Sequence, residues 1–320
     1  MAVYTEVDDD DLARFVGDYG LGRLLACKGI AEGVENTNYM IDTDKGRYIL
    51  TLYEKRVAEK DLPFFLGLMD HLAARGLNCP LPVRKPDGAM LGRLAGRPAA
   101  IITFLEGVSH KHPKPVHCHA VGRALAEMHA AAADFSLTRA NALGLAGWRP
   151  LFDRFAAEAD TIEPGLHADI ATELSILERA WPHDLPRGVI HADLFDDNVF
   201  FIGDELSGLI DFYFACNDAL AYDIAVCLNA WCFDASFRFD IAKGRALLAG
   251  YQSVRTLTPA EREALPLLAR GAALRFLLTR AYDWINTPPG ALVARKSPAE
   301  YLARLRAHRA VTDARQYGLA

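Results

Sequence analysis

Several features that define other protein classes are missing from this sequence of 320 residues. It has no run of about 18 apolar residues, which excludes an ordinary membrane-spanning helix. Its net charge of −6 and its lack of a basic tail leave no electrostatic footprint for nucleic acid. The N-terminal segment is acidic and lacks the basic and apolar regions of a secretory signal. We therefore expect a cytoplasmic protein that binds neither a membrane nor nucleic acid.

Cysteine is also scarce and unpatterned. The six cysteines are scattered without a CxxC pair, which argues against a disulfide or metal framework and favours reduced thiols. No internal repeat or low-complexity segment is present. Half of the residues are hydrophobic and a quarter are charged, so the chain can bury a sizeable core. A small molecule is the expected partner.

The first hundred residues carry strand patterns. Three runs, 23–30, 37–43 and 47–53, combine β-branched, aromatic and aliphatic residues around short turns, which predicts an antiparallel meander. A helical spacing follows over 57–75. A predicted hairpin around Asp87-Gly88 then leads into the last strand of this part.

From about residue 113 the patterns become helical. Long helices are predicted from 113 onward, over 148–182, over 220–252 and over about 259–286. The segments TPAE (258–261) and SPAE (297–300) have the form of capping boxes. The predicted fold is α+β in two lobes, with a β-rich lobe over 1–105 and a mostly helical lobe over 106–320.

One segment between two strand-like runs carries an unusual set of polar residues. In VIHADLFDDNVFF (189–201), His191, Asp193 and Asn198 fit H-x-D-x-x-x-x-N, the spacing of a kinase catalytic loop. A carboxylate there orients the hydroxyl that accepts a phosphoryl group, and the amide oxygen is a ligand for Mg²⁺. Asp211, at the end of the apolar run LIDF, lies 18 residues after Asp193 and is the expected second ligand, with ATP phosphates completing the coordination.

These segments resemble a known family. HADLFDDN, LIDF and DALAYDIA (218–225) look like the aminoglycoside phosphotransferase and choline kinase group, whose members fold like protein kinases. The resemblance implies that Asp193 is the catalytic base, that Asn198 and Asp211 hold Mg²⁺, and that Asp223 braces the catalytic loop. It implies ATP and Mg²⁺ as cofactors. We expect His191 to hold the loop by hydrogen bonds.

The β-rich lobe should bind the nucleotide. EGVENTNY stands where a kinase carries its glycine-rich loop, although Gly33 is its only glycine. Backbone N–H groups and short polar side chains would still cradle phosphates there. The predicted phosphate-binding residues are Gly33, Asn36, Thr37 and Asn38. The segment TFLEG (103–107), with Phe104 and Glu106, resembles the hinge whose backbone binds adenine.

The phosphate-binding lysine of kinases is missing. RYILTLYEK (47–55) places Thr51 at the position of that lysine. Lys55 shares a strand face with Thr51 and is the predicted substitute, and Lys28 is the alternative. Without the lysine, the role of Glu59 as its helix partner is open.

The acceptor is predicted from a further resemblance. GVENTNYMI, RYILTLYEK and LRFLLTRAYDWINTPPGALV (274–293) are similar to homoserine kinases of the kinase-like fold, which implies L-homoserine as substrate and a role in threonine biosynthesis. Polar residues on the helix over 259–286 line one stripe: Arg275, Thr279, Tyr282, Asp283 and Asn286. We predict that Arg275 binds the substrate carboxylate and Asp283 its ammonium group, with Tyr213 as a further contact.

Alternatives remain at this stage. Arg280 and Asp283 would also suit an intrahelical ion pair, and the anion of a buried Arg275 would equally be a protein carboxylate. Choline is the runner-up acceptor, since its ammonium needs an aromatic cage. The candidate cage residues are Tyr213, Trp231, Tyr282 and Trp284. An aminoglycoside would need a broad acidic cleft, and Thr51 alone favours a catalytically silent module.

Overall fold

The computed structural model describes residues 5–30, 36–54, 57–287 and 295–319. The chain divides into two compact units. The first unit comprises Met1–Glu106 together with Gly208–Tyr213, and the second comprises Gly107–Ser207 together with Phe214–Ala320. No helix in the described part of the chain is long and apolar enough to cross a membrane.

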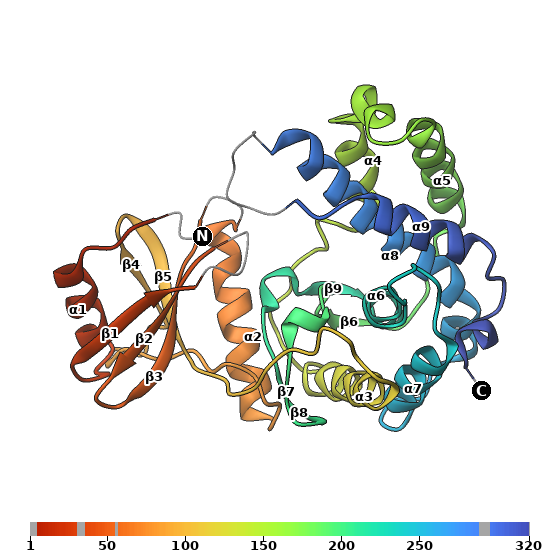
Figure 1. Cartoon of the computed structure of the whole chain (residues 1–320). Helices are drawn as coiled ribbons and strands as arrows, with labels where there is room; N and C mark the ends of the chain where they lie inside the picture. Colours follow the sequence, from red (N-terminus) through yellow and green to blue (C-terminus); the bar gives the residue numbers. More distant parts are fainter. Residues whose placement is uncertain (1–4, 31–35, 55–56, 288–294, 320) are drawn as a thin grey trace. The chain divides into compact units, whose positions relative to one another are not determined.

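The first unit is built on a five-stranded antiparallel sheet with the order β1-β2-β3-β5-β4 (Figure 1). Its strands are β1 (Leu24–Gly29), β2 (Thr37–Thr43), β3 (Gly46–Leu52), β4 (Leu91–Leu94) and β5 (Arg97–Thr103). Its helical elements are α1 (Asp9–Asp18), the 3₁₀ turn η1 (Glu59–Asp61) and α2 (Leu62–Ala74). The predicted meander and the following helix are therefore confirmed.

One face of this sheet forms a core with α1. Alternate residues of β2 are buried, because successive side chains of a strand point to opposite faces. Leu12, Phe15 and Val16 of α1 belong to the same apolar cluster as Ile41 and Leu50 of the sheet. The strand prediction overlooked α1, whose start is stabilised by Asp8 accepting two backbone N–H groups of the first turn.

The predicted hairpin around Asp87-Gly88 is wrong. A tight turn does form there, with the N–H of Gly88 bonded to the carbonyl of Lys85, but it precedes β4 and joins no two strands of the sheet. The strands β4 and β5 are connected at Ala95-Gly96, where both residues have positive φ angles of 48° and 74°. Positive φ at both central residues is the geometry of a type I′ turn, which Ala-Gly signals weakly.

The second unit is mainly helical. Its helices are α3 (Pro115–Ala131), α4 (Leu145–Asp153), α5 (Leu166–Ala180), α6 (Leu220–Trp231), α7 (Ile241–Gln252), α8 (Pro259–Asn286) and α9 (Ala299–Arg309). Its strands include β6 (Arg187–Ile190), paired with β9 (Cys216–Ala219). The strands β7 (Val199–Ile202) and β8 (Glu205–Leu209) form a two-stranded ribbon. Short 3₁₀ turns are η2 (Ala156–Thr161), η3 (Asp196–Asn198), η4 (Phe212–Phe214) and η5 (Ala314–Tyr317).

Glycines let two of these helices approach closely. α3 and α7 lie side by side in Figure 1, and a Cβ at Gly122 of α3 would lie 2.0 Å from the carbonyl oxygen of Leu247. A Cβ at Gly250 of α7 would lie 2.0 Å from the carbonyl oxygen of His119. Each helix therefore places a glycine against the backbone of the other, which allows α3 and α7 to pack closely together.

The two predicted capping boxes have different outcomes. Thr258 caps α8 as expected, because its hydroxyl accepts the N–H of Glu261 while the Glu261 carboxylate accepts the N–H of Thr258. At α9 the box does not form, and Pro298 is the N-cap residue. The carboxylate of Glu300 is bound instead by Arg280 and Arg304.

Candidate active site

The segment HADLFDDN lies between β6 and β7, and a side chain of α6 binds its backbone by hydrogen bonds. Asp223, in the first turn of α6, is fully buried. One of its carboxylate oxygens accepts the N–H of His191 at 2.7 Å and the other accepts the N–H of Ala192 at 2.8 Å. Ala192 has a φ of 63°, a left-handed conformation that an L-residue adopts only when its surroundings impose it.

A third hydrogen bond completes the environment of Asp223. Nε2 of His129, on α3, lies 3.1 Å from the carboxylate, and Nδ1 of the same ring lies 2.9 Å from the hydroxyl of Tyr251 on α7. Burial raises the pKa of Asp223, but the bond and charge of His129 and the neighbouring His191 outweigh burial and lower it. Asp223 is therefore an anion that joins α3 and α6 to the loop. His129 was not predicted, because its spacing along α3 is that of any core residue.

Asp193 is anchored through both its backbone and its side chain. Its carbonyl oxygen accepts Nδ2 of Asn198 at 2.8 Å and the N–H of Phe195 at 2.9 Å. Its Oδ1 accepts Nη1 of Arg275 at 3.2 Å. Among the described residues no hydrogen bond reaches its Oδ2, and the side chain is 19% exposed. One oxygen of Asp193 is thus fixed and the other is available to a ligand.

Asn198 and Asp211 have donor atoms that suit a divalent cation. The Nδ2 atom of Asn198 is used by the carbonyl of Asp193, which leaves the amide oxygen as the remaining ligand atom of this buried side chain. Asp211, in the first unit, follows β8 with a φ of 62° and is exposed. An amide oxygen and a carboxylate are the hard ligands that Mg²⁺ takes, so the residues present fit this ion.

A second group of possible metal ligands lies elsewhere in the second unit, but both ring nitrogens of its buried histidine are used in hydrogen bonds. The ligand atoms of His110, His117 and Asp204 lie within 4.8 Å of one another. Nδ1 of His117 accepts the N–H of Lys114 at 3.1 Å, so the ring proton is on Nε2, which donates to Asp204 at 2.8 Å. This group ties the start of α3 to the β7–β8 turn and lacks an open nitrogen for a metal at His117.

The polar stripe predicted on α8 makes contacts within the protein. Arg275 binds the carboxylate of Asp193 and the carbonyl of Ala192. The anion that pairs with this buried arginine is therefore a protein carboxylate, the alternative considered above. Arg154 donates to the hydroxyl of Tyr282. Arg280 pairs with Glu300. Other hydrogen bonds run along the helix. The side chain of Thr279 donates to the carbonyl of Phe276 and that of Asn286 to the carbonyl of Tyr282, while the C-cap residue Thr287 donates to the backbone carbonyl of Asp283.

The place of the missing lysine is taken by neutral side chains of the first unit. The hydroxyl of Thr51 donates to Oδ1 of Asn38 at 2.8 Å, and Thr51 is buried. The hydroxyls of Tyr53 and Tyr213 lie 3.1 Å apart. Burial raises the pKa of Tyr213 to about 12, so this hydroxyl keeps its proton at neutral pH. Tyr213 therefore lies two residues after Asp211 as part of a hydrogen-bonded pair.

The other predicted nucleotide-binding residues have the following positions. Gly33 and Lys55 lie outside the described residues. Oδ1 of Asn36 accepts the N–H of Glu54 at 3.4 Å, and the hydroxyl of Thr37 donates to the carboxylate of Glu54 at 2.9 Å. Both side chains thus form hydrogen bonds with Glu54, two residues after the end of β3.

The hinge segment and the helix glutamate are also placed. Phe104 is 36% exposed, and the guanidinium of Arg47 lies 5.4 Å from its ring centroid. Glu106 ends the main segment of the first unit. Glu59 pairs with Arg93 at 2.8 Å, which gives it a partner in place of the missing lysine. Lys28 is exposed on β1.

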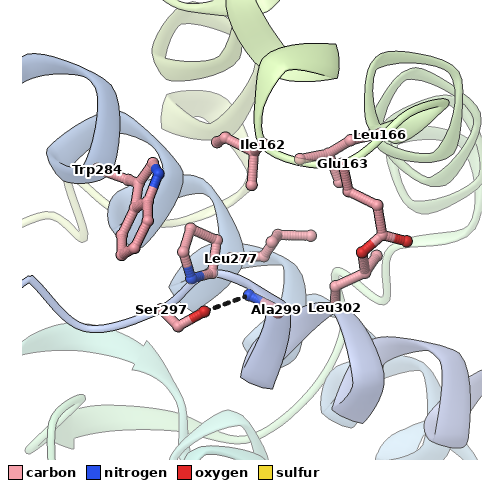
Figure 2. Close-up of a pocket in the computed structure, with 9 residues that line it drawn as sticks. Ile162, Glu163, Leu166, Leu277, Trp284, Ser297, Ala299 and Leu302 are labelled. Atoms are coloured by element: carbon pink, nitrogen blue, oxygen red, sulfur yellow. Dashed lines mark hydrogen bonds between the residues drawn. The ribbon is translucent and has the colours of Figure 1, made fainter.

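A small cavity lies in the second unit away from these residues. Figure 2 shows it between the start of α5, α8 and α9, with Glu163 on one side and Trp284 on the other. Its volume is about 90 Å³, below the roughly 300–1,000 Å³ of usual small-molecule sites. Neither Asp193 nor the residues predicted to bind L-homoserine line it, although Trp284, a candidate cage residue for choline, does. We therefore do not assign the acceptor to this cavity.

Comparison with known proteins gives a consistent result. The model of the phosphotransferase enzyme family matches residues 26–257. A homoserine kinase of Sinorhizobium fredii is 64% identical over 319 residues, which cover 100% of this chain and 98% of that protein. A homoserine kinase of Parvibaculum lavamentivorans is 64% identical, with coverage of 100% and 99%.

Solved structures share the fold at low sequence identity. An amicoumacin kinase in complex with AMP-PNP and Ca²⁺ superposes with a TM-score of 0.70 at 15% identity, covering 97% of each chain. A choline kinase of Cryptosporidium parvum has a TM-score of 0.64 at 15% identity, covering 89% of this chain and 88% of that chain. These likenesses confirm the predicted kinase-like α+β fold. The family match and the full-length relatives establish that the chain belongs to the phosphotransferase enzyme family.

Proposed function

We propose that this protein transfers the γ-phosphoryl group of ATP to the side-chain hydroxyl of L-homoserine, which yields O-phospho-L-homoserine for threonine biosynthesis in the cytoplasm. The observation that carries the proposal is Asp193. Its Oδ1 is held by Arg275 while its Oδ2 has no hydrogen-bond partner among the described residues. The full-length relatives at 61–64% identity, named homoserine kinase, support the choice of acceptor.

The chain's own residues supply positioning and proton transfer. Asp193 orients the acceptor hydroxyl and takes its proton as the new P–O bond forms. Asn198 and Asp211 would hold Mg²⁺, which when bound neutralises charge on the transferring phosphates. Asp223 keeps the loop in the conformation that presents Asp193. The reaction requires no covalent enzyme intermediate.

Choline is less well supported as the acceptor, because its predicted cage residues are engaged elsewhere. Trp231 is fully buried, with its indole N–H bonded to the carbonyl of Leu194. The face of Tyr282 is covered by the guanidinium of Arg154 at 4.3 Å. Trp284 is covered in the same way by Arg295 at 5.2 Å. A quaternary ammonium would have to displace these cations.

The direct test is an ADP-release assay with MgATP against L-homoserine, choline, ethanolamine and kanamycin at equal concentrations. We expect turnover with L-homoserine. Asp193→Asn should lower kcat by about 10²–10⁴-fold with little change in ATP affinity, whereas Asp211→Ala should weaken both. Asp197→Asn is the matched control, since it makes the same change in the same loop at an exposed ion pair with Lys296. A wild-type kcat in Asp193→Asn would refute the proposal.

A further inference from the structure

Arg275 lies in an apolar part of α8 and has few polar contacts. Only 4% of its surface is exposed. Its guanidinium lies over the ring of Phe276, 3.8 Å from the centroid, and 5.2 Å from that of Phe214. A guanidinium withdrawn from water in this way needs an anion or hydrogen-bond acceptors to offset its desolvation.

Both acceptors come from the catalytic loop. Nη1 of Arg275 donates to the carbonyl oxygen of Ala192 and to Oδ1 of Asp193, each at 3.2 Å. The N–H on the other side of Ala192 is bound by the buried carboxylate of Asp223. Ala192, with its left-handed backbone, is therefore held between the buried carboxylate of Asp223 on α6 and the buried guanidinium of Arg275 on α8.

We propose that Arg275 is a positioning residue that fixes the rotamer of Asp193 and directs its Oδ2 toward the acceptor hydroxyl. This inference rests on the proposed role of Asp193 as catalytic base. A carboxylate held at Oδ1 loses rotation about its χ torsions, so the second oxygen is preorganised for the incoming hydroxyl. In this arrangement Arg275 acts through Asp193. This positioning role takes the place of the expected role, in which Arg275 binds the carboxylate of the substrate.

The two roles predict different kinetics. A substrate-binding arginine contributes mainly to acceptor affinity, whereas a positioning arginine contributes to kcat. For Arg275→Met we expect kcat with L-homoserine to fall by about 10²-fold, the effect of misplacing a reacting group by roughly an ångström. The dissociation constant of L-homoserine, measured by calorimetry, should stay within threefold of the wild type. Arg275→Lys should recover part of kcat, because an ammonium can also donate to both oxygens.

Arg280→Met is the matched control. Arg280 lies on the same helix and is mostly buried, but it binds Glu300 and the carbonyl of Ser297. Its replacement should lower the melting temperature without a comparable loss of kcat. Melting curves for Arg275→Met and Arg280→Met then separate loss of folding from loss of positioning.

The outcomes distinguish this inference from the proposed function. A fall in kcat with unchanged acceptor affinity, partly rescued by lysine, supports it. More than tenfold weaker L-homoserine binding in Arg275→Met, or an unchanged kcat, would overturn it. Asp193→Asn is measured in parallel: if that variant keeps the wild-type kcat, the proposed function fails, and if it is impaired while Arg275→Met is not, only the present inference fails.

Discussion

The carboxylate of Asp223 accepts the backbone N–H of Ala192 at 2.8 Å, and this contact joins the first turn of α6 to the loop that carries Asp193. The same carboxylate accepts the N–H of His191 and the ring N–H of His129. These three donors hold the side chain as an anion, although its complete burial opposes the charge. The backbone at His191 and Ala192 is therefore held by a buried charge on α6.

Asp223→Asn should be strongly destabilising. The new amide would place its own N–H groups against the backbone donors, and we expect a loss of about 3–5 kcal/mol in the free energy of unfolding, measured by denaturant titration. Asp240→Asn is the control. Asp240 also accepts two backbone N–H groups, as the N-cap of α7, but it is partly exposed and asparagine caps equally well. Equal stability of the two variants would contradict the bracing role of Asp223.

Ala192→Gly should leave the stability of the protein nearly unchanged. Glycine removes the energetic cost of a φ of 63° in the folded state, but it also raises the conformational entropy of the unfolded state. The two effects oppose each other, and each is about 1 kcal/mol. Ala225→Gly, in the middle of α6, has no such relief and should lose at least about 1 kcal/mol. Denaturant titration of the two variants compares them directly. A loss at Ala192 as large as that at Ala225 would show that the left-handed conformation is not maintained in solution.

Replacing a glycine by alanine should destabilise the protein in one helix and stabilise it in another. Gly122→Ala would force a methyl group into the carbonyl of Leu247, 2.0 Å away, and should cost about 1–3 kcal/mol or more. Gly17→Ala, in α1, meets no atom within 4 Å and should gain about 0.5–1 kcal/mol. Melting temperatures should therefore shift in opposite directions. A Gly122→Ala variant as stable as the wild type would show that α3 and α7 separate easily.

The prediction from sequence succeeded where local signals were strong. Helix α8 runs over Pro259–Asn286, as expected from its apolar length and its capping box at Thr258. The partner of Arg275 was left open for a physical reason. Its contact with Asp193 joins residues 82 positions apart in the chain, and periodicity along α8 shows that the arginine is surrounded by apolar residues without showing which anion the fold brings to it.

The buried residue His308 predicts how stability depends on pH. Its Nε2 faces Oδ1 of Asn229 at 3.2 Å, and its Nδ1 faces the hydroxyl of Tyr317 at 2.7 Å. The amide nitrogen of Asn229 donates to the carbonyls of Ala225 and Ala269, so its oxygen must accept the hydrogen of Nε2. The neutral ring is thus satisfied on both nitrogens. Burial, aided by the charge of Arg304, lowers the pKa of His308 to about 3.

The sign of the pH effect follows from this pKa. Above pH 7 the ring is neutral in both the folded and the unfolded states and contributes no pH dependence. Below about pH 6.5 the histidine binds a proton in the unfolded state but not in the folded state. The free energy of unfolding therefore decreases as the pH is lowered, by about 2 kcal/mol at pH 5. His308→Gln should remove this part of the slope, whereas His119→Gln, at an exposed position of α3, should keep it. Because both variants lose one histidine, a wild-type slope in His308→Gln, measured by denaturant titration between pH 5 and 7.5, would show that the buried ring is protonated in the folded protein.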